Sequence, residues 1–234
     1  MITLYGGPTP NARKVAIALL EMGFEWQLEP IDILAGDQLQ PAFLALNPNN
    51  KTPVIVDHEG PGGGDFILCE SGAILLYLAE KSGQFLPADP AARALCWQWL
   101  MFQMAGIGPM FGQNAHFSHY AKDKHPYAIE RYAREVDRLL MVLDKRLGEA
   151  EWLAGDDYSI ADMATLPWLT SQSEAKADAF PHIRRWYVAA MERPAVAEGM
   201  ALGVARAETI AGGLKGFGDE HRAILWGDRQ HAVR

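Results

Sequence analysis

The segment NPNNKTPVIVDHEGPGGGDFILCESGAILLYLAEKSG, residues 47–83, decides the fold of the first part of the chain. Two short apolar runs, Val54–Val56 and Phe66–Leu68, are joined by a glycine-rich link without a helical pattern, which predicts an antiparallel hairpin. A helical pattern follows from Ser71 to Lys81, and Gly83 is its expected end. The segment therefore predicts two paired strands followed by a helix.

The residues before this segment predict a parallel pair of strands. Ile2–Tyr5 is typical of a strand, Thr9 of a helix N-cap and Pro10 of a first helical position. Gly23 would end that helix, and Phe24–Ile33 would form a second strand, which a crossover helix makes parallel to the first. The order β-α-β, short helix, β-β-α is that of a thioredoxin-like domain.

The residues after the segment predict helices alone. Ala91–Met104 is apolar and aromatic, and its helix is expected to run as far as Gly106, Gly108 and Pro109. Apolar residues at three- and four-residue steps in 126–147 indicate one amphipathic helix. Ser159 and Asp162 have the spacing of a capping box, so a buried helix should begin there.

These patterns predict an α/β domain followed by an all-α helical bundle. We place the thioredoxin-like domain at residues 1–84, a linker at 85–92, the helical domain at 93–200 and a C-terminal extension at 201–234. The extension could cover the site or a partner subunit, with Trp226 as an anchor, or it could be loosely ordered.

Composition narrows the functional classes. The 234 residues carry a formal net charge of −8 and no Lys/Arg-rich run, which argues against a nucleic-acid partner. We expect a cytoplasmic protein without a membrane span, because neither a secretory signal nor a long apolar stretch is present. Cys69 and Cys96 lack C-x-x-C spacing and are expected to be reduced thiols.

Together, these segments resemble the glutathione transferase superfamily over roughly residues 1 to 200. The resemblance depends on three motifs in order: NPNNKTPV at 47–54, ESGAI at 70–74 and SIAD at 159–162. Within the superfamily, TPN at 9–11, PMFGQ at 109–113 and PYAIERY at 126–132 are similar to the bacterial Nu class, whose relatives include the yeast nitrogen-regulatory, prion-forming protein. The resemblance implies a homodimeric, glutathione-dependent disulfide-bond reductase.

The resemblance also implies which residues hold the middle and the γ-glutamyl end of glutathione. Pro53 resembles the superfamily's cis-proline, which leaves the main chain of Thr52 free to pair with the cysteinyl part; a trans turn proline is the alternative. Backbone N–H groups at Glu70 and Ser71 could receive the γ-glutamyl carboxylate, and the Glu70 side chain could bind the ammonium. Ser71 could instead simply cap the helix.

Three further ligand contacts follow from the same match. Lys51 and Gln38 should reach the glycyl carboxylate, and Arg131 of the helical domain could reach the ligand. The alternative for all three is a solvated surface side chain. No metal ion is implied.

The thiol of glutathione needs a site that favours its thiolate form, since an unperturbed thiol of this kind titrates near ~8.5. The start of the first helix supplies a positive dipole end, so Thr9 is the first candidate catalytic residue and Asn11 the second. Thr9 could also be committed to capping, although a hydroxyl can accept one bond and donate another. Tyr5 lies inside the strand pattern and is expected to pack in the core.

Two groups of side chains in the helical part are less specific. Several aromatic and sulfur-containing residues could line an acceptor pocket but are more typical of core: Trp97, Phe102, Met104, Phe111 and Tyr132. Three histidines lie in what we expect to be a loop, residues 114–126, without ligand spacing for a metal: His116, His119 and His125.

Three functions stay open from the sequence. Bound glutathione could reduce a disulfide without a protein cysteine, with Cys69, next to Glu70, as the residue to watch. The same thiolate could be transferred to an apolar electrophile or reduce an organic peroxide. The chain could also be a non-catalytic binding or regulatory protein like the yeast relative.

Overall fold

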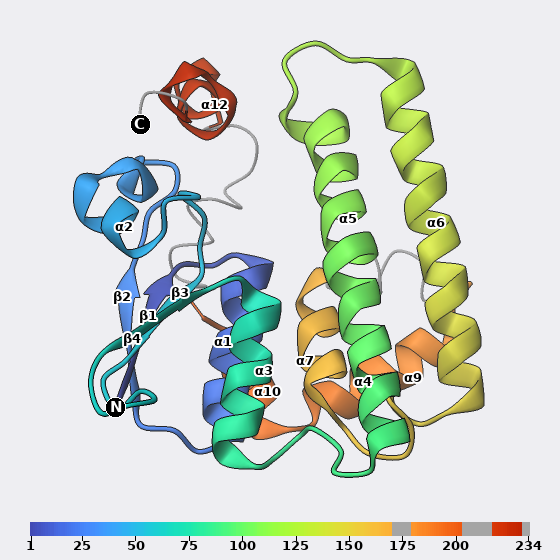
Figure 1. The fold of residues 1–234 in the computed structure, drawn as a ribbon. Helices are drawn as coiled ribbons and strands as arrows, with labels where there is room; N and C mark the ends of the chain where they lie inside the picture. The colour runs from blue at the N-terminus through green and yellow to red at the C-terminus, as the bar shows by residue number, and fades with distance from the viewer. Residues whose placement is uncertain (170–178, 203–216, 231–234) are drawn as a thin grey trace.

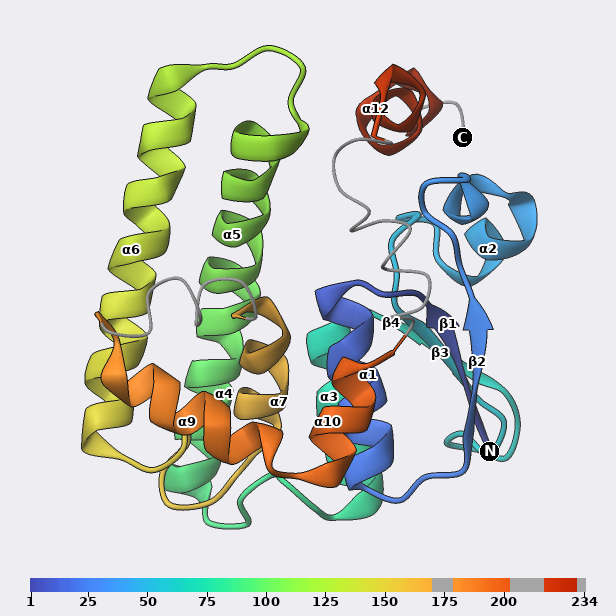
Figure 2. The same cartoon turned by 180° about the vertical axis from the view of Figure 1, so that it is seen from behind.

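The computed structural model describes residues 1–169, 179–202 and 217–230, and these form two parts (Figure 1). The first part is a four-stranded sheet with helices, and the second is a group of helices. Helices α1 (Pro10–Glu21) and α3 (Ser71–Ser82) lie between the sheet and the second part in both views (Figures 1 and 2). The predicted fold class, α/β followed by all-α, is confirmed.

The sheet has the strand order β2-β1-β3-β4. Strands β1 (Ile2–Gly6) and β2 (Trp26–Pro30) are parallel, whereas β3 (Val54–Asp57) is antiparallel to both β1 and β4 (Phe66–Cys69). Both predicted pairings are therefore correct. The second strand is shorter than its apolar pattern predicted.

The helices of the first part begin and end where their local signals indicate. Thr9 caps α1 with its side chain, and Pro10 is the first helical residue, as predicted. Helix α3 ends at Gly83, whose φ of 70° lies in the left-handed region that glycine adopts without strain. Between β2 and β3 lie the 3₁₀ helix η1 (Asp37–Leu39) and the short helix α2 (Pro41–Leu46).

The described second part is a series of helical segments, of which the first four, from residue 90 to residue 120, continue directly into one another. In chain order the segments are α4 (Pro90–Phe102), π-helical turn η2 (Gln103–Ile107), α5 (Gly108–Ala115), π-helical turn η3 (His116–Tyr120), α6 (Pro126–Glu149), α7 (Ile160–Thr165), η4 (Leu166–Trp168), α9 (Pro181–Met191) and α10 (Pro194–Met200). The predicted helix of residues 91–104 is observed as α4, which ends at Phe102, before Gly106 and Pro109. The turn η2 starts a new segment there, and proline is tolerated in a first turn because its missing N–H needs no partner.

A buried carboxylate organises the second part. Asp162 is 0% exposed and accepts hydrogen bonds from the backbone N–H groups of Leu153 (2.9 Å) and Ser159 (3.0 Å). It also accepts from the Ser159 hydroxyl (2.9 Å) and from the indole N–H of Trp186 (2.8 Å). The predicted capping box is therefore confirmed, and the same carboxylate ties α7 to α9.

The described part of the C-terminal extension contains helix α12 (Asp219–Trp226) and the 3₁₀ turn η5 (Asp228–Gln230). Residues 203–216 and 231–234 of the predicted extension lie outside the described residues. None of the described helices is both long and apolar enough to cross a membrane.

Replacing Asp162 with alanine is expected to lower the free energy of unfolding by about 3–5 kcal/mol, because four donors lose their shared buried acceptor. Urea unfolding followed by circular dichroism measures this change. Asp156→Ala is the matched control, since Asp156 is exposed in the preceding loop and should cost less than ~0.5 kcal/mol. Equal losses in the two variants would contradict the role of the buried carboxylate.

Candidate functional site

The sheet register brings three predicted site segments to one edge. Tyr5 near the end of β1 is opposite Val54 at the start of β3, and Val54 is opposite Cys69 at the end of β4. The β1–α1 turn, the Thr52–Pro53 bond and the start of α3 therefore meet at this edge. We call this edge, with the residues that line it, the candidate site.

The start of α1 presents hydrogen-bond donors to the candidate site. The Thr9 oxygen accepts from the backbone N–H of Ala12 (3.3 Å), so the hydroxyl caps the helix and keeps its hydrogen for another acceptor. The Asn11 Oδ1 accepts from the indole N–H of Trp168 (3.1 Å). Because an indole N–H only donates, this bond fixes the orientation of the amide and leaves the Asn11 NH₂ group free to donate elsewhere.

The loop before β3 holds an unpaired stretch of main chain. The Thr52–Pro53 bond is cis, as the family resemblance implied, and the alternative of a trans turn proline is wrong. Within the described residues, the N–H and C=O groups of Thr52 make no backbone hydrogen bond. The neighbouring Lys51 carbonyl accepts from the Asn47 side-chain amide (2.7 Å), while the Lys51 side chain is exposed.

The start of α3 has unsatisfied backbone donors. Glu70 occupies the N-cap with a φ of 69°, a left-handed conformation that non-glycine residues adopt only at some energetic cost, and its side chain makes no capping bond. Ser71 is the first helical residue, so the alternative that it caps this helix is wrong. Nothing in the described residues occupies the N–H groups of this first turn, and free N–H groups at a helix start are the kind of donors that bind anions.

Two other predicted residues have different surroundings from those that we expected. Gln38 is 4% exposed, its amide nitrogen donates to the Ile33 carbonyl (3.1 Å) and its Oε1 has no partner among the described residues, so the surface alternative is wrong for it. Arg131 is exposed on α6 and pairs with Glu135 one helical turn away (3.4 Å). That pair is the arrangement of a solvated helix face.

Two further residues, which the sequence did not predict, contact residues of the candidate site. Trp168 orients Asn11 from the helical part of the chain. Lys14, 1% exposed, donates to the Ser71 hydroxyl oxygen (3.3 Å) and to the Gln103 Oε1 (2.6 Å). A signal for Lys14 was available, because it follows Asn11 by three residues on the same helix face and directly precedes the apolar run 15–20.

Helix α12 contacts both parts of the chain. The Trp226 ring packs edge-on against His116, with ring centroids 4.6 Å apart, and the Arg222 Nε donates to the Tyr120 carbonyl (2.8 Å). On the other side, Ile224 is buried and its Cγ2 lies next to Gly36 in the loop after β2. Trp226 therefore anchors α12 through its contact with the His116 ring.

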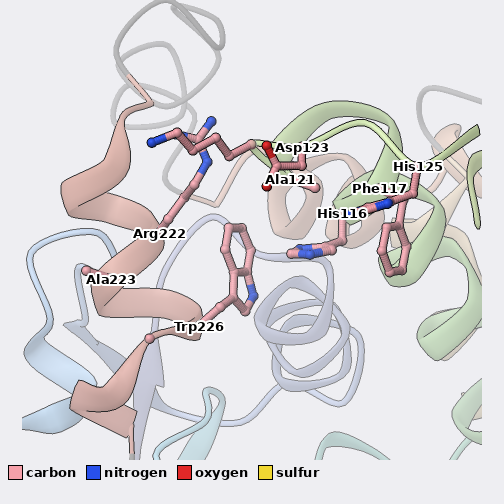
Figure 3. Close-up of a pocket in the computed structure, with 10 residues that line it drawn as sticks. His116, Phe117, Ala121, Asp123, His125, Arg222, Ala223 and Trp226 are labelled. Atoms are coloured by element: carbon pink, nitrogen blue, oxygen red, sulfur yellow. The ribbon is translucent and has the colours of Figure 1, made fainter.

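A pocket of about 410 Å³ lies where α12 meets η3 and the loop after it (Figure 3). Aromatic rings of His116, Phe117 and Trp226 line it together with Lys122 and Arg222. Burial, and then the charge of Lys124, lower the pKa of His116, which favours a neutral ring against Trp226. Residues 114–120 are helical, so the expectation of one loop from 114 to 126 is wrong for that part, and no metal-ligand cluster is found in the described residues.

The side chains that could have lined an acceptor pocket separate into different environments. Phe111 is buried in the core, whereas Trp97 is exposed on α4. Tyr132 stacks on Phe117 at a centroid distance of 5.5 Å. Cys69 and Cys96 are free thiols, and burial raises the pKa of Cys96.

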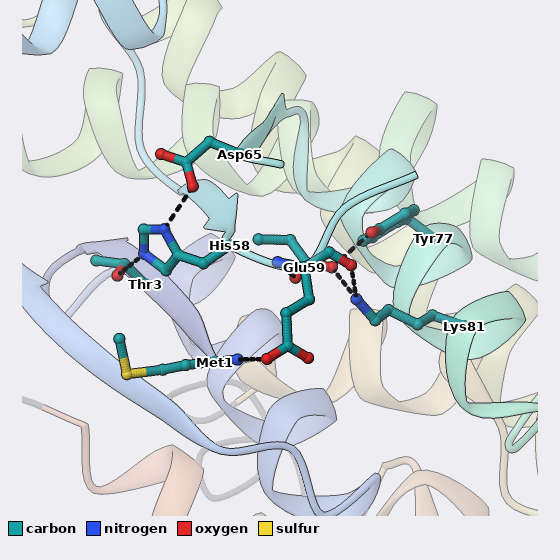
Figure 4. Close-up of polar contacts among 8 residues, drawn as sticks. Met1, Thr3, His58, Glu59, Asp65, Tyr77 and Lys81 are labelled. Atoms are coloured by element: carbon teal, nitrogen blue, oxygen red, sulfur yellow. Dashed lines mark hydrogen bonds and ion pairs between the residues drawn. The ribbon is translucent and has the colours of Figure 1, made fainter. Parts of the chain in front are cut away.

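Polar contacts hold the far end of the β3–β4 hairpin, away from the candidate site (Figure 4). The buried carboxylate of Asp57 accepts from the Tyr77 hydroxyl (2.5 Å) and from Lys81, both on α3. The His58 ring is hydrogen-bonded to Thr3 (2.9 Å) and Asp65 (2.8 Å). Helix α3 is thus fixed to the sheet at one end, which orients its free first turn at the other.

A thioredoxin-like domain with a cis-proline and a free helix start, followed by helices, defines a glutathione transferase fold. Residues 9–81 match the glutathione S-transferase N-terminal domain and residues 100–194 match the C-terminal domain of the same family. The chain belongs to the glutathione S-transferase family.

Individual relatives are similar over most of their length. The disulfide-bond oxidoreductase YfcG of Escherichia coli is 46% identical over 203 residues, which cover 86% of this chain and 94% of that protein. A glutathione transferase family member from Pseudomonas fluorescens, solved with two glutathione molecules bound, is 47% identical with a TM-score of 0.82, covering 86% and 92% of the two chains. A Pseudomonas putida glutathione transferase with one glutathione disulfide bound per subunit is 46% identical with a TM-score of 0.81, covering 85% and 90%.

Replacing Trp226 with alanine is expected to speed amide hydrogen exchange of residues 219–226 by about tenfold, because the aromatic contacts to His116 and Tyr120 are lost. Exchange followed by mass spectrometry of the corresponding peptide measures it. Trp97→Ala is the matched control, since both tryptophans are 43% exposed. Unchanged exchange in the Trp226 variant would contradict the docking of α12 through this ring.

Proposed function

We propose that this protein reduces disulfides with glutathione, using the thiolate of bound glutathione and no protein cysteine. The donors at the start of α1, above all the Asn11 amide whose oxygen is held by the Trp168 indole, are the observation that carries the proposal. The disulfide-bond oxidoreductase name of the Escherichia coli relative and the glutathione or glutathione disulfide bound in solved relatives support it.

The candidate site offers a partner for each part of glutathione. The free N–H groups at Ser71 and the following residues suit the γ-glutamyl carboxylate, and the exposed Glu70 suits the ammonium. The unpaired main chain of Thr52 suits the cysteinyl part, and the exposed Lys51 suits the glycyl carboxylate. Gln38 would bind the glycyl carboxylate from its buried position in η1, and Arg131 would have to leave Glu135 to reach the ligand.

The thiol then lies at the positive end of α1. The Thr9 hydroxyl and the Asn11 NH₂ group can both donate to sulfur, and donors to an anion favour its formation. The thiolate attacks one sulfur of the substrate disulfide, forming a mixed disulfide and releasing a thiolate that takes a proton from solvent. A second glutathione thiolate attacks the glutathione sulfur of the mixed disulfide, which gives glutathione disulfide and the second substrate thiol.

We also infer a cytoplasmic homodimer. Reduced Cys69 and Cys96 are consistent with a reducing compartment, and the dimer follows from the resemblance to the superfamily. The acceptor is a small molecule or an exposed disulfide, and no metal takes part in the proposed chemistry.

Asn11→Ala is expected to raise the pKa of the bound thiol by about one pH unit and to lower kcat/KM for a small disulfide by about tenfold or more, because a hydrogen bond to an anion contributes roughly 1.5–3 kcal/mol. Trp168→Phe should cause a smaller rise in the thiol pKa and a smaller loss of kcat/KM, since the Asn11 amide then loses the hydrogen bond that fixes its orientation. The pH dependence of thiolate absorbance in the binary complex measures the pKa.

Tyr127→Phe is the control for this series, since Tyr127 is 80% exposed on α6 and its substitution should leave the pKa of the bound thiol and kcat/KM unchanged. Loss of activity in the Asn11 variant with an unchanged pKa of the bound thiol would contradict the thiolate role of the amide.

Cys69→Ser is expected to keep the turnover of a small disulfide within about twofold of the unmodified protein, because two glutathione molecules supply both electrons. Steady-state assays with a small disulfide, a chlorinated aromatic and an alkyl hydroperoxide test the reaction class. Cys96→Ser is the paired control at the buried cysteine. Abolished turnover in the Cys69 variant would refute the ligand-only mechanism, and a disulfide that was the poorest of the three substrates would favour transferase or peroxidase activity.

A further inference from the structure

The proposed mechanism does not use the buried amino group of Lys14. This group lies between the two parts of the chain: it donates to the Ser71 hydroxyl of α3 and to the Gln103 Oε1 of η2, and it contacts the Met104 sulfur (3.5 Å). Gln103 is itself fully buried. Lys14 thus connects the first turn of α3, where the γ-glutamyl carboxylate is proposed to bind, with the helical domain.

The surroundings of Lys14 lack a direct counter-charge. Its three neighbours are a hydroxyl, a neutral amide and a thioether, and no described carboxylate forms an ion pair with it. Glu70 at the N-cap of α3 is the titratable group whose charge favours its protonated form. A buried ammonium without a paired anion is costly. An anion that binds nearby would therefore stabilise the protonated form of Lys14.

On the other described elements packed against α1, the charged side chains are exposed or are bonded to residues other than Lys14. Asp162 of α7 is committed to Leu153, Ser159 and Trp186, and η4 carries no titratable side chain. On α10, Glu198 is exposed, and the neighbouring Arg193 pairs with Glu21 at the opposite end of α1.

The contact with Ser71 also fixes what that hydroxyl can do. Since Lys14 donates into its oxygen, the hydroxyl hydrogen must point to another acceptor, and it now points to the Met104 sulfur at 3.7 Å. Sulfur is a weak acceptor, so a carboxylate at the start of α3 would be a better partner.

We propose that Lys14 is a positioning residue for the γ-glutamyl carboxylate, which it binds indirectly by holding Ser71 as a donor and by taking up a proton when the carboxylate arrives. This inference rests on the proposed glutathione site. It adds the expectation that the protein takes up a proton when glutathione binds. The proton comes from solvent, and the ammonium that forms is balanced by the carboxylate.

The proton balance follows from the surroundings of Lys14. Burial lowers the pKa of Lys14 to about 7, against the weaker opposing charge of Glu70. A carboxylate bound nearby raises that pKa again, so binding takes up a proton and becomes weaker as the pH rises above about 7.

The test is calorimetric titration of the full-length protein with S-methylglutathione, which has no ionisable thiol. Titrations at pH ~7.5 in buffers of different ionisation enthalpy give the number of protons taken up, and we expect about half a proton or more per site from a group titrating near 7. Lys14→Met should abolish most of this uptake, flatten the pH dependence of Kd and weaken binding by about tenfold. Lys145→Met, at an exposed lysine on α6, should behave like the unmodified protein.

The titrations distinguish a failure of the Lys14 role from a failure of the proposed glutathione site. Binding by the unmodified protein without proton uptake, or equal uptake by the Lys14 variant, would overturn the role of Lys14 and leave the glutathione site standing. Absence of binding at every pH would instead overturn the proposed function. If the Lys14 variant does not fold, the proton uptake and the pH dependence of Kd of the unmodified protein decide alone.

Discussion

The middle of helix α1 is enclosed on all sides, and this constraint determines which part of the first domain can bind a ligand. The side chains from Val15 to Leu19 are fully buried, because the sheet, α3 and the helical domain surround them. Helix α10 approaches so closely that a Cβ at Gly199 would lie 2.6 Å from the Ile17 side chain, which only glycine avoids. The buried apolar stretch after Lys14 leaves the first turns of α1 for polar function at the edge where three strand ends meet.

Features that depend on local sequence were predictable. The capping residues Thr9 and Ser159, the glycine that ends α3 and the hairpin between β3 and β4 all follow from hydrogen bonds or backbone conformations within a few residues. The cis bond before Pro53 was predicted in another way, through a family resemblance, since no local pattern distinguishes it from a turn proline.

Features that depend on distant partners were not predictable. The pattern of its own helix does not explain why the charged Lys14 is buried. The explanation is its hydrogen bonds to Ser71 and Gln103, which are 57 and 89 residues away in the sequence. The Trp168–Asn11 contact spans 157 residues. The helical path through Pro109 was not predictable either. A π-helical turn joins α4 to α5 there, and no sequence pattern distinguishes such a turn.

The two helix starts at the candidate site also explain how an acidic protein could hold an acidic ligand. Strands β1 and β4 both run antiparallel to β3, so they end at the same edge and deliver the positive ends of α1 and α3 to it. The protein as a whole carries a net charge of −8, which opposes the approach of an anion. Backbone dipoles offset this locally without a permanently charged side chain in the interior. A buried lysine with a pKa of about 7 suits the same arrangement, because it is only partly charged when the site is empty, and in the proposed binding step its charge is completed when an anion is there to balance it.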